Sequence, residues 1–363
     1  MSLNVHWFLP GLGDSRNIDG TGHFRHPTVE YLSEVGMAAD RLGFEGMLTP
    51  VGSWCEDPWI MTSHVAAATE RIKFIVALRP GATAPTLIAQ MSGTYQRATG
   101  GRLILNIVVG GEEREMRRFG EWDSKEQRYG RLDEFLTIFR GCFDGPFDFE
   151  GDLYRVERAM AGPFPVTPPP VFFGGVSEAA DRIAAKHVDV QLSWCEPLDA
   201  MEERIERLRG MAAEHDRELA FGLRVHAISR DTADEAWNET DRLLAAMDPE
   251  TVRFMVEAQK TSASEGQRRM AELHKGSTDS DALVVGRNLW AGVGLVRAGA
   301  GTALVGSHEE IADRLAEFHE VGITHVILSG HPHLEEAYNV GEGLLPVLRE
   351  RGLIDEREEV AAT

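Results

Sequence analysis

"IKFIVALRPGATAPTLIAQMSGTYQRATGGRLILNIVVG", residues 72–110, decides the fold, because it contains two strand patterns with a helical pattern between them. The runs 72–78 and 102–110 are short and rich in β-branched residues, as buried strands are. Residues 85–100 carry apolar side chains at three- and four-residue spacing and end on a glycine, which is typical of an amphipathic helix. The stretch therefore predicts a strand–helix–strand unit, the building block of a parallel sheet.

Strand patterns of the same kind recur along the chain, with helical patterns such as 28–43 and 309–322 between them. There are eight of these strand patterns: 3–9, 44–50, 72–78, 102–110, 170–175, 188–194, 221–229 and 324–330. Eight repeats of strand and helix are the signature of an α/β fold of the (β/α)8 TIM barrel type. We expect a single barrel domain over residues 1–350, followed by a flexible carboxyl-terminal tail, 351–363.

The spacing of the strand patterns is uneven at one place. Residues 230–323 are far more than one helix needs, so we expect a barrel with insertions, the largest of them between strands seven and eight. Long insertions in compact domains are usually lids or binding loops. A doubly wound sheet is the competing fold, but no G-x-G-x-x-G motif follows the first strand, so the usual dinucleotide fingerprint is absent.

Composition narrows the class of protein. The chain has 37 Lys and Arg against 58 Asp and Glu, a net charge of −21, which disfavours nucleic acid and anionic membranes as partners. Three cysteines at no metal-ligand spacing favour a reducing compartment. The first residues lack the pattern of a secretory signal, and no membrane span is predicted. These features predict a cytoplasmic enzyme.

Active sites of such barrels lie at the carboxyl ends of the strands. Arg224 and His226 are two positions apart on the seventh predicted strand, so both should point toward the barrel axis. A buried guanidinium must meet a carboxylate or an anionic ligand. The pair is therefore either a core salt bridge beside a structural histidine, or an anion clamp beside a proton carrier.

Other strand ends carry polar and aromatic groups. "FGGVS", residues 173–177, is a turn before a helix, where exposed amides and the Ser177 hydroxyl could cradle a phosphate. Phe8 and Trp194 could either plug the barrel mouth or stack on a planar ring. Cys55 is either a buried structural thiol or a thiol near the site, with neighbouring carboxylates that would raise its pKa.

"SGHPH", residues 329–333, raises the possibility of a metal-dependent hydrolase that uses His226, His331 and His333. Such sites draw ligands from several strand ends, and the first strand offers only His6, with no H-x-H motif. We therefore expect no metal.

Several long motifs, taken in order, resemble a known family. They include "AADRLGFEGMLTP", "CEDPW", "KFIVALRPG", "FFGGVSEAA", "QRRMAELH" and "NLWAGVGLVRAGAGTALVGS", the last followed by "PHLEEAY". From the first residues to about residue 350 the chain resembles the FMNH2-dependent alkanesulfonate monooxygenases of the bacterial-luciferase-like superfamily, with their sulfoquinovose branch as one candidate. An F420-dependent relative, or a luciferase-like flavin enzyme acting on another substrate, is the alternative.

The resemblance implies a two-component flavin enzyme. Reduced FMN, supplied by a separate NAD(P)H-dependent flavin reductase, and O2 would convert an organosulfonate to an aldehyde and sulfite. Relatives form dimers or tetramers, which implies a homodimer or homotetramer. Residues 251–285 would be a mobile lid that keeps water out.

The resemblance also implies roles for individual residues. The catalytic group would contain Cys55, Arg224, His226, Arg297 and His331. The sulfonate would be held by Trp194, Arg224, Arg297 and His333. Reduced FMN would be held by Phe8, Asn106, Tyr129, Gly174, Gly175 and Ser177, with the phosphate near Tyr129, Gly175 and Ser177. A sulfonate is a permanent anion with three acceptor oxygens, which the forked donors of arginine suit.

Position 331 departs from the family pattern, which has tyrosine where this chain has His331. The phenol has an intrinsic pKa near 10 and the imidazole one near 6.5. The smaller ring leaves room and adds hydrogen-bonding capacity. This substitution favours a hydroxylated sulfonate such as sulfoquinovose, with a short alkanesulfonate as the other possibility.

Overall fold

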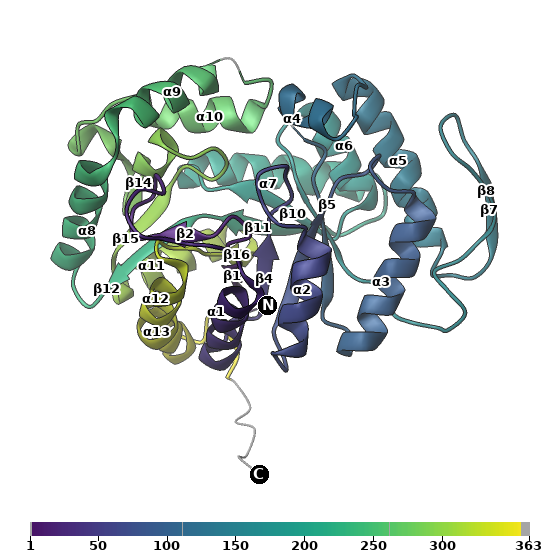
Figure 1. Ribbon diagram of the computed structural model, residues 1–363, viewed down its shortest axis with the longest axis horizontal. Coiled ribbons are helices and arrows are strands. Elements are labelled where there is room, and N and C mark those ends of the chain that lie inside the picture. Colours follow the sequence, from purple (N-terminus) through teal and green to yellow (C-terminus); the bar gives the residue numbers. More distant parts are fainter. Residues whose placement is uncertain (1, 111, 261, 357–363) are drawn as a thin grey trace, which may run out of the picture.

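A closed barrel of eight parallel strands forms the centre of the computed structural model, which describes residues 2–110, 112–260 and 262–356 (Figure 1). Its strands follow one another around the barrel in the order β1, β4, β5, β6, β9, β10, β11 and β16. Their bounds are Asn4–Phe8, Gly46–Thr49, Lys73–Leu78, Leu103–Ile107, Val171–Gly174, Val190–Trp194, Ala220–Arg224 and Ile323–Ile327. Each of the eight predicted strand patterns overlaps one of these strands, with β11 and β16 each beginning one residue before the predicted range, which confirms the barrel.

Helices cover the outside of the barrel. They are α1 (Val29–Leu42), α2 (Pro58–Ala67), α3 (Pro85–Thr99), α5 (Lys125–Gly141), α6 (Glu178–His187), α7 (Leu198–Ala213) and α11 (His308–Glu320). Their ends follow local sequence signals. In α1, the Thr28 hydroxyl accepts a hydrogen bond from the amide of Tyr31, and Gly43 ends the helix with a φ of 103°. The predicted helices 28–43, 85–100 and 309–322 are therefore present.

The core has two layers because successive side chains of a strand point to opposite faces. In β1, Val5 and Trp7 pack against the surrounding helices in the larger core cluster. His6 lies on the other face of β1, in the barrel interior, where its ring packs edge to face against Phe172. Apolar residues from several strands fill the rest of that interior: Leu48, Ile75, Ile104, Phe172, Val190, Leu192 and Ile327.

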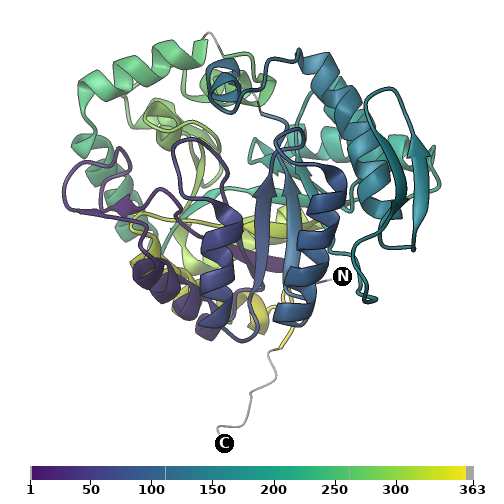
Figure 2. The same ribbon diagram turned by 45° about the vertical axis from the view of Figure 1, so that its right-hand side comes forward.

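The longest connection runs from β11 to β16 and forms a structure of its own. It contains α8 (Ala233–Ala246), α9 (Pro249–Lys260), α10 (Glu265–His274) and two 3-10 turns, η1 (Asp281–Leu283) and η2 (Gly292–Leu295). A four-stranded sheet of β12 (His226–Arg230), β15 (Ala303–Ser307), β14 (Leu289–Trp290) and β13 (Val284–Gly286) lies beneath these helices, over a second core cluster. Figure 2 shows α9 and α10, in green, beyond the same end of the barrel as α4 (Glu113–Arg118), in blue.

The predicted strand 221–229 is divided at Val225. β11 ends at Arg224, and β12 begins at His226 in the other sheet, where it pairs with β15. The division follows from hydrogen bonding, because the barrel partner β16 ends at Ile327 and the His226 amide donates to Thr302 instead. Arg224 and His226 therefore belong to two different sheets, and the prediction that they share one strand is wrong.

Short elements complete the chain. Two hairpins are formed by β2 (Asp14–Ser15) with β3 (Phe24–Arg25) and by β7 (Phe147–Glu150) with β8 (Arg155–Ala159). The last elements are α12 (His333–Tyr338), a π-helical segment (Asn339–Leu344) and α13 (Leu345–Glu350). None of the helices in the described part of the chain has the length and apolar character that crossing a bilayer requires.

The predicted tail begins inside the fold. Leu353 packs against the main core, and its carbonyl accepts a hydrogen bond from the Leu3 amide at 2.7 Å. Residues 357–363 of the predicted tail lie outside the described residues, as does residue 261 within the predicted lid.

Candidate active site at the carboxyl ends of the barrel strands

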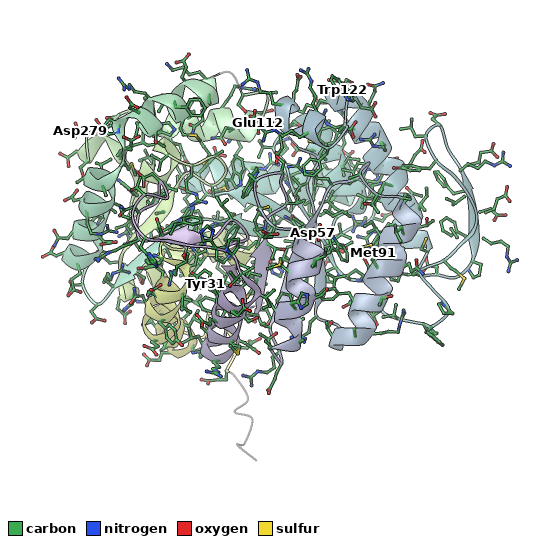
Figure 3. The ribbon with its side chains drawn as sticks, viewed as in Figure 1. Tyr31, Asp57, Met91, Glu112, Trp122 and Asp279 are labelled. Carbon is green, nitrogen blue, oxygen red and sulfur yellow. The ribbon has the colours of Figure 1, made fainter. Side chains whose placement is uncertain are left out.

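A cavity of about 550 Å³ opens at the carboxyl ends of the barrel strands. Its walls come from the ends of β6, β9, β10 and β11, from α4 and the start of α5, and from the segment that begins α10. Figure 3 shows Glu112, next to α4, and Trp122 at the same end of the molecule as α9 and α10. The volume and the mixed lining are those of a pocket for a ligand the size of a cofactor.

The turn after β9 forms one wall of the cavity. Ser177 precedes α6, and its hydroxyl accepts a hydrogen bond from the Ala180 amide and lies 3.4 Å from the Tyr129 hydroxyl. Gly175 lies so close to α6 that a Cβ at position 175 would stand 2.7 Å from the Cβ of Ala180. A helix amino terminus with free amides and a hydroxyl favours an anionic group such as a phosphate. Gly174, Gly175, Ser177 and Tyr129 all line the cavity.

Two buried polar atoms in the cavity wall have no partner among the described residues. They are Oδ1 of Asn106, at the end of β6, and Nε of Arg128, in α5. Buried polar groups are almost always hydrogen-bonded, and leaving one unpaired costs about 1–3 kcal/mol. Both residues line the cavity, but these two atoms are themselves buried behind its surface.

Arg224 and His226 are connected by Ser329, a residue for which no role was predicted from the sequence. Nη2 of Arg224 donates to the Ser329 hydroxyl at 2.8 Å, and that hydroxyl lies 2.8 Å from Nδ1 of His226. Arg224 also lies over the Phe8 ring, with 4.9 Å from Cζ to the ring centroid. The structure thus brings Arg224, His226 and Phe8 together. Arg224 lines the large cavity, whereas Phe8 and His226 lie behind it.

A second arginine continues this cluster. Nη1 of Arg297 lies 3.4 Å from Nε2 of His331, whose ring is 5.7 Å from that of His226 and 4.7 Å from that of His333. The peptide bond between His331 and Pro332 is cis. All three imidazoles are buried.

Asp14 holds the far side of the cluster. Its fully buried carboxylate accepts hydrogen bonds from the Tyr31 hydroxyl at 2.8 Å, the Arg25 guanidinium at 2.9 Å and the His333 amide at 2.6 Å. The loop after β1 is thereby attached to the start of α12. No role was predicted for Asp14. The only feature of the sequence that could have pointed to one is an acidic residue in the loop after the first strand.

The two arginines of the cluster are cations in an environment that disfavours positive charge. Burial lowers the pKa of Arg224, and the nearby charge of Arg297 lowers it further. Burial also lowers the pKa of Arg297, opposed by the charge of Asp14. Within the described part of the chain, neither guanidinium forms an ion pair with a carboxylate. Two neighbouring cations, neither of them in an ion pair with a carboxylate of the described residues, favour the binding of an anion.

The same two charges lower the pKa values of the three histidines. Burial is the largest cause that lowers the pKa of His226, His331 and His333 well below the usual value, and the charges of Arg224 and Arg297 add to it. All three rings are therefore neutral near pH 7. The two guanidinium groups beside them would also repel a metal cation. In residues 2–110, 112–260 and 262–356, no group of three or more metal-ligating side chains is arranged to hold an ion.

Trp194 forms the contact between the barrel and the long insertion. A Cβ at Gly266, in the first turn of α10, would stand 3.1 Å from Cζ3 of Trp194. Nearby, the Glu196 carboxylate pairs with Arg269 of α10 at 2.6 Å. The Ser262 hydroxyl donates to Glu112, before α4, at 2.7 Å. The segment predicted as a lid thus bridges two sides of the cavity.

Cys55 lies apart from this cluster. Its thiol contacts the carbonyls of Pro50 and Gly52 at 3.8 and 3.5 Å, and it does not line the cavity. Burial raises the pKa of this thiol to about 11. It is protonated at neutral pH.

Residues 3–325 match the family model described as luciferase-like monooxygenase. A riboflavin lyase solved with modified FMN and riboflavin superposes with a TM-score of 0.81 at 17% identity, over 98% of this chain and 93% of that chain. EDTA monooxygenase from Chelativorans sp. BNC1 superposes with a TM-score of 0.76 at 17% identity, over 98% and 95%.

A third similar structure uses a different cofactor. An F420-dependent secondary alcohol dehydrogenase, solved with an F420–acetone adduct, superposes with a TM-score of 0.67 at 16% identity, over 96% of this chain and 99% of that chain. At these identities the likeness establishes a shared fold and leaves the substrate open.

Proposed function

The chain belongs to the luciferase-like monooxygenase family, and we propose that it is an FMNH2- and O2-dependent monooxygenase that cleaves the carbon–sulfur bond of an organosulfonate. The overall reaction converts R–CH2–SO3⁻, FMNH2 and O2 into R–CHO, SO3²⁻, FMN, H2O and H⁺. The observation that carries the proposal is the pair Arg224 and Arg297, which belong to one cluster and form no ion pair with a carboxylate among the described residues.

The cavity fits a flavin mononucleotide. The Gly175 turn, the Ser177 hydroxyl and Tyr129 would hold its phosphate at the amino terminus of α6. The unpaired Oδ1 of Asn106 offers an acceptor to the ring system, and Trp194 offers an apolar face. When bound, the reduced flavin would supply the electrons that activate O2.

The cationic cluster suits a sulfonate. This group is an anion at every physiological pH and has three acceptor oxygens, whereas guanidinium has only donors. Arg224 reaches the cavity wall and Arg297 lies behind it with its hydrogen-bonding partners Ile18 and His331. We assign both guanidiniums to the sulfonate, with Trp194 and His333 completing its site.

The neutral histidines supply hydrogen bonds without adding charge. His226 and His331 are neutral near pH 7 because of burial and the two arginines. Nδ1 of His331 is buried without a partner among the described residues, and a substrate hydroxyl that reached it would satisfy it. For this reason we favour a hydroxylated or sugar sulfonate such as sulfoquinovose over a simple alkanesulfonate.

The insertion would exclude water during the reaction. Residues 264–266 line the cavity, and Gly266 packs on Trp194. A closed site strengthens the field of Arg224 and Arg297 on developing negative charge. We therefore propose the 251–285 segment as the lid. Cys55, in the loop after β4, would be a protonated thiol outside the cavity wall.

The proposal includes partners. Reduced FMN would come from a separate NAD(P)H-dependent reductase, and the enzyme would be a cytoplasmic homodimer or homotetramer. F420 is the alternative cofactor, because an F420-dependent dehydrogenase shares the fold.

The decisive experiment supplies reduced FMN from a reductase and screens alkyl, hydroxyalkyl and sugar sulfonates for sulfite release. Sulfite in proportion to O2 consumed is the expected result, with higher kcat/KM for hydroxylated substrates. Parallel reactions with reduced F420 test the alternative. If no sulfonate releases sulfite with either cofactor, the proposed reaction is wrong.

A further inference from the structure

Ser329 joins the two residues at the centre of the cluster. It follows β16, its side chain is completely buried, and its hydroxyl oxygen lies 2.8 Å from both Nη2 of Arg224 and Nδ1 of His226. One hydroxyl therefore mediates the contact between a guanidinium and an imidazole.

The direction of both hydrogen bonds follows from chemistry. A guanidinium has donors and no acceptor, so the Ser329 oxygen must accept from Arg224. Arg224 cannot turn freely, because its Nη1 donates to the Val225 carbonyl at 2.8 Å and lies 3.4 Å from the Ile327 carbonyl. The single hydrogen of the hydroxyl is then directed at Nδ1 of His226.

We propose that Ser329 is a positioning residue that fixes neutral His226 in one tautomer, with Nδ1 unprotonated and the hydrogen on Nε2. In the opposite tautomer both Arg224 and His226 would donate to the Ser329 oxygen. The hydroxyl hydrogen would then need a third acceptor, and the described part of the chain places none within hydrogen-bonding distance of it. Buried donors without a partner are rare, which favours the first arrangement.

The ring of His226 is neutral near pH 7. Burial lowers its pKa well below the usual value, and the charges of Arg224, Arg297 and His333 lower it further. A neutral imidazole carries one hydrogen, on Nδ1 or on Nε2, so the contact with Ser329 selects between the two.

The tautomer decides what His226 can do. With Nδ1 engaged by Ser329 and Nε2 carrying hydrogen, the resting ring is a hydrogen-bond donor and has no free lone pair with which to take up a proton. Proton uptake at Nδ1 would require the Ser329 hydroxyl to turn away from the ring, against the hydrogen bond from Arg224. This conclusion rests on hydrogen bonding within the chain and is independent of the proposed substrate.

Nuclear magnetic resonance of the full chain with 15N-labelled histidine tests the tautomer directly. Long-range 1H–15N correlations distinguish a protonated ring nitrogen from an unprotonated one, and a His226→Gln variant identifies the His226 signals. We expect one tautomer at pH 7, protonated at Nε2. In Ser329→Ala we expect loss of the single tautomer, with averaged nitrogen shifts. Ser329→Thr, which retains a hydroxyl, should restore the wild-type pattern.

A matched control comes from another serine–histidine pair. The Ser229 hydroxyl lies 2.7 Å from Nδ1 of His308, outside the cluster. Ser229→Ala should change the signals of His308 and leave those of His226 unchanged. The proposal is overturned if wild-type His226 is protonated at Nδ1, a measurement that needs no variant, or if a folded Ser329→Ala retains the single Nε2 tautomer. Neither result would decide whether sulfonates are substrates.

Discussion

Gly266 packs against the indole of Trp194, and this contact attaches the long insertion to the barrel: a Cβ at position 266 would stand 3.1 Å from Cζ3 of the ring. A side chain at position 266 would press on the indole, because 3.1 Å is shorter than an ordinary contact between two carbon atoms. Trp194 ends β10 and Gly266 lies in the first turn of α10. This contact therefore joins the wall of the cavity to the segment predicted as its lid.

Gly266→Val should separate α10 from Trp194 and weaken cofactor binding. Overpacking costs roughly 1–3 kcal/mol, so reduced FMN should bind on the order of tenfold more weakly. Anaerobic titration of tryptophan fluorescence measures the dissociation constant. Gly210→Val is the control, because position 210 in α7 has open space around it. Equal affinity of both variants for reduced FMN would show that the contact does not hold the lid segment in place.

Arg297→Ala should abolish turnover and weaken sulfonate binding. Hydrogen bonds to charged groups contribute roughly 1.5–3 kcal/mol, which corresponds to a loss of affinity on the order of 10- to 100-fold. Calorimetric titration with a sulfonate and a sulfite assay measure the two effects. Arg287→Ala is the control, since Arg287 is in the same insertion but is 56% exposed and pairs with Glu317. Near-normal turnover in Arg297→Ala would remove Arg297 from the mechanism.

His331→Tyr should shift the substrate preference toward simple alkyl sulfonates. The phenol is larger and removes the Nδ1 group that is unpaired in the structure. We expect the ratio of kcat/KM for hydroxylated over alkyl substrates to fall by roughly tenfold, the size of one lost hydrogen bond. Exposed His215 offers a matched control, His215→Tyr. An unchanged ratio would refute the specificity argument.

The Cys55 thiol should be unreactive at neutral pH. Burial raises its pKa to about 11, opposed by a backbone hydrogen bond at Gly52. Because the thiolate is the nucleophile, alkylation by iodoacetamide should be slow at pH 7 and accelerate up to about pH 11. Mass spectrometry of the labelled peptide measures the rate, with urea-unfolded protein as the control. Rapid labelling of folded protein at pH 7 would be inconsistent with a protonated thiol.

A buried histidine pair should make folding stability depend on pH. Nε2 of His6 lies 3.0 Å from Nδ1 of His325 in the barrel interior. Burial lowers the pKa of both, that of His325 to about 4. The unfolded chain, with a pKa near 6.5, therefore binds more protons between pH 4 and 6.5. The contribution of the pair to the free energy of unfolding is therefore complete above pH 6.5 and decreases as the pH falls. For His325 alone the decrease amounts to roughly 3 kcal/mol.

Urea unfolding at pH 5 and pH 7.5 measures this dependence. His325→Gln should show a smaller difference between the two pH values than the wild type, whereas His215→Gln, on the surface, should show the wild-type difference. If His325→Gln retained the full difference, the pair would not be its origin.

Strand and helix positions could be predicted because their signals are local. Residues 72–110 contain β5, α3 and β6 at the expected places, since period-two and period-3.6 patterns need no knowledge of the rest of the chain. The break at Val225 could not be predicted. The sequence from 221 to 229 is a continuous strand pattern, and only the end of β16 makes the chain change its hydrogen-bonding partner.

The sequence by itself determined the barrel, the long insertion and the residue types at the strand ends, because these depend on periodicity and spacing along the chain. Tertiary structure alone decided which of those residues meet. It joined Arg224 to His226 through Ser329, attached His333 to Asp14, and left Cys55 outside the cavity wall. These contacts join residues 100 or more positions apart in the sequence, and they follow from how the strands close into a barrel, which no local pattern encodes.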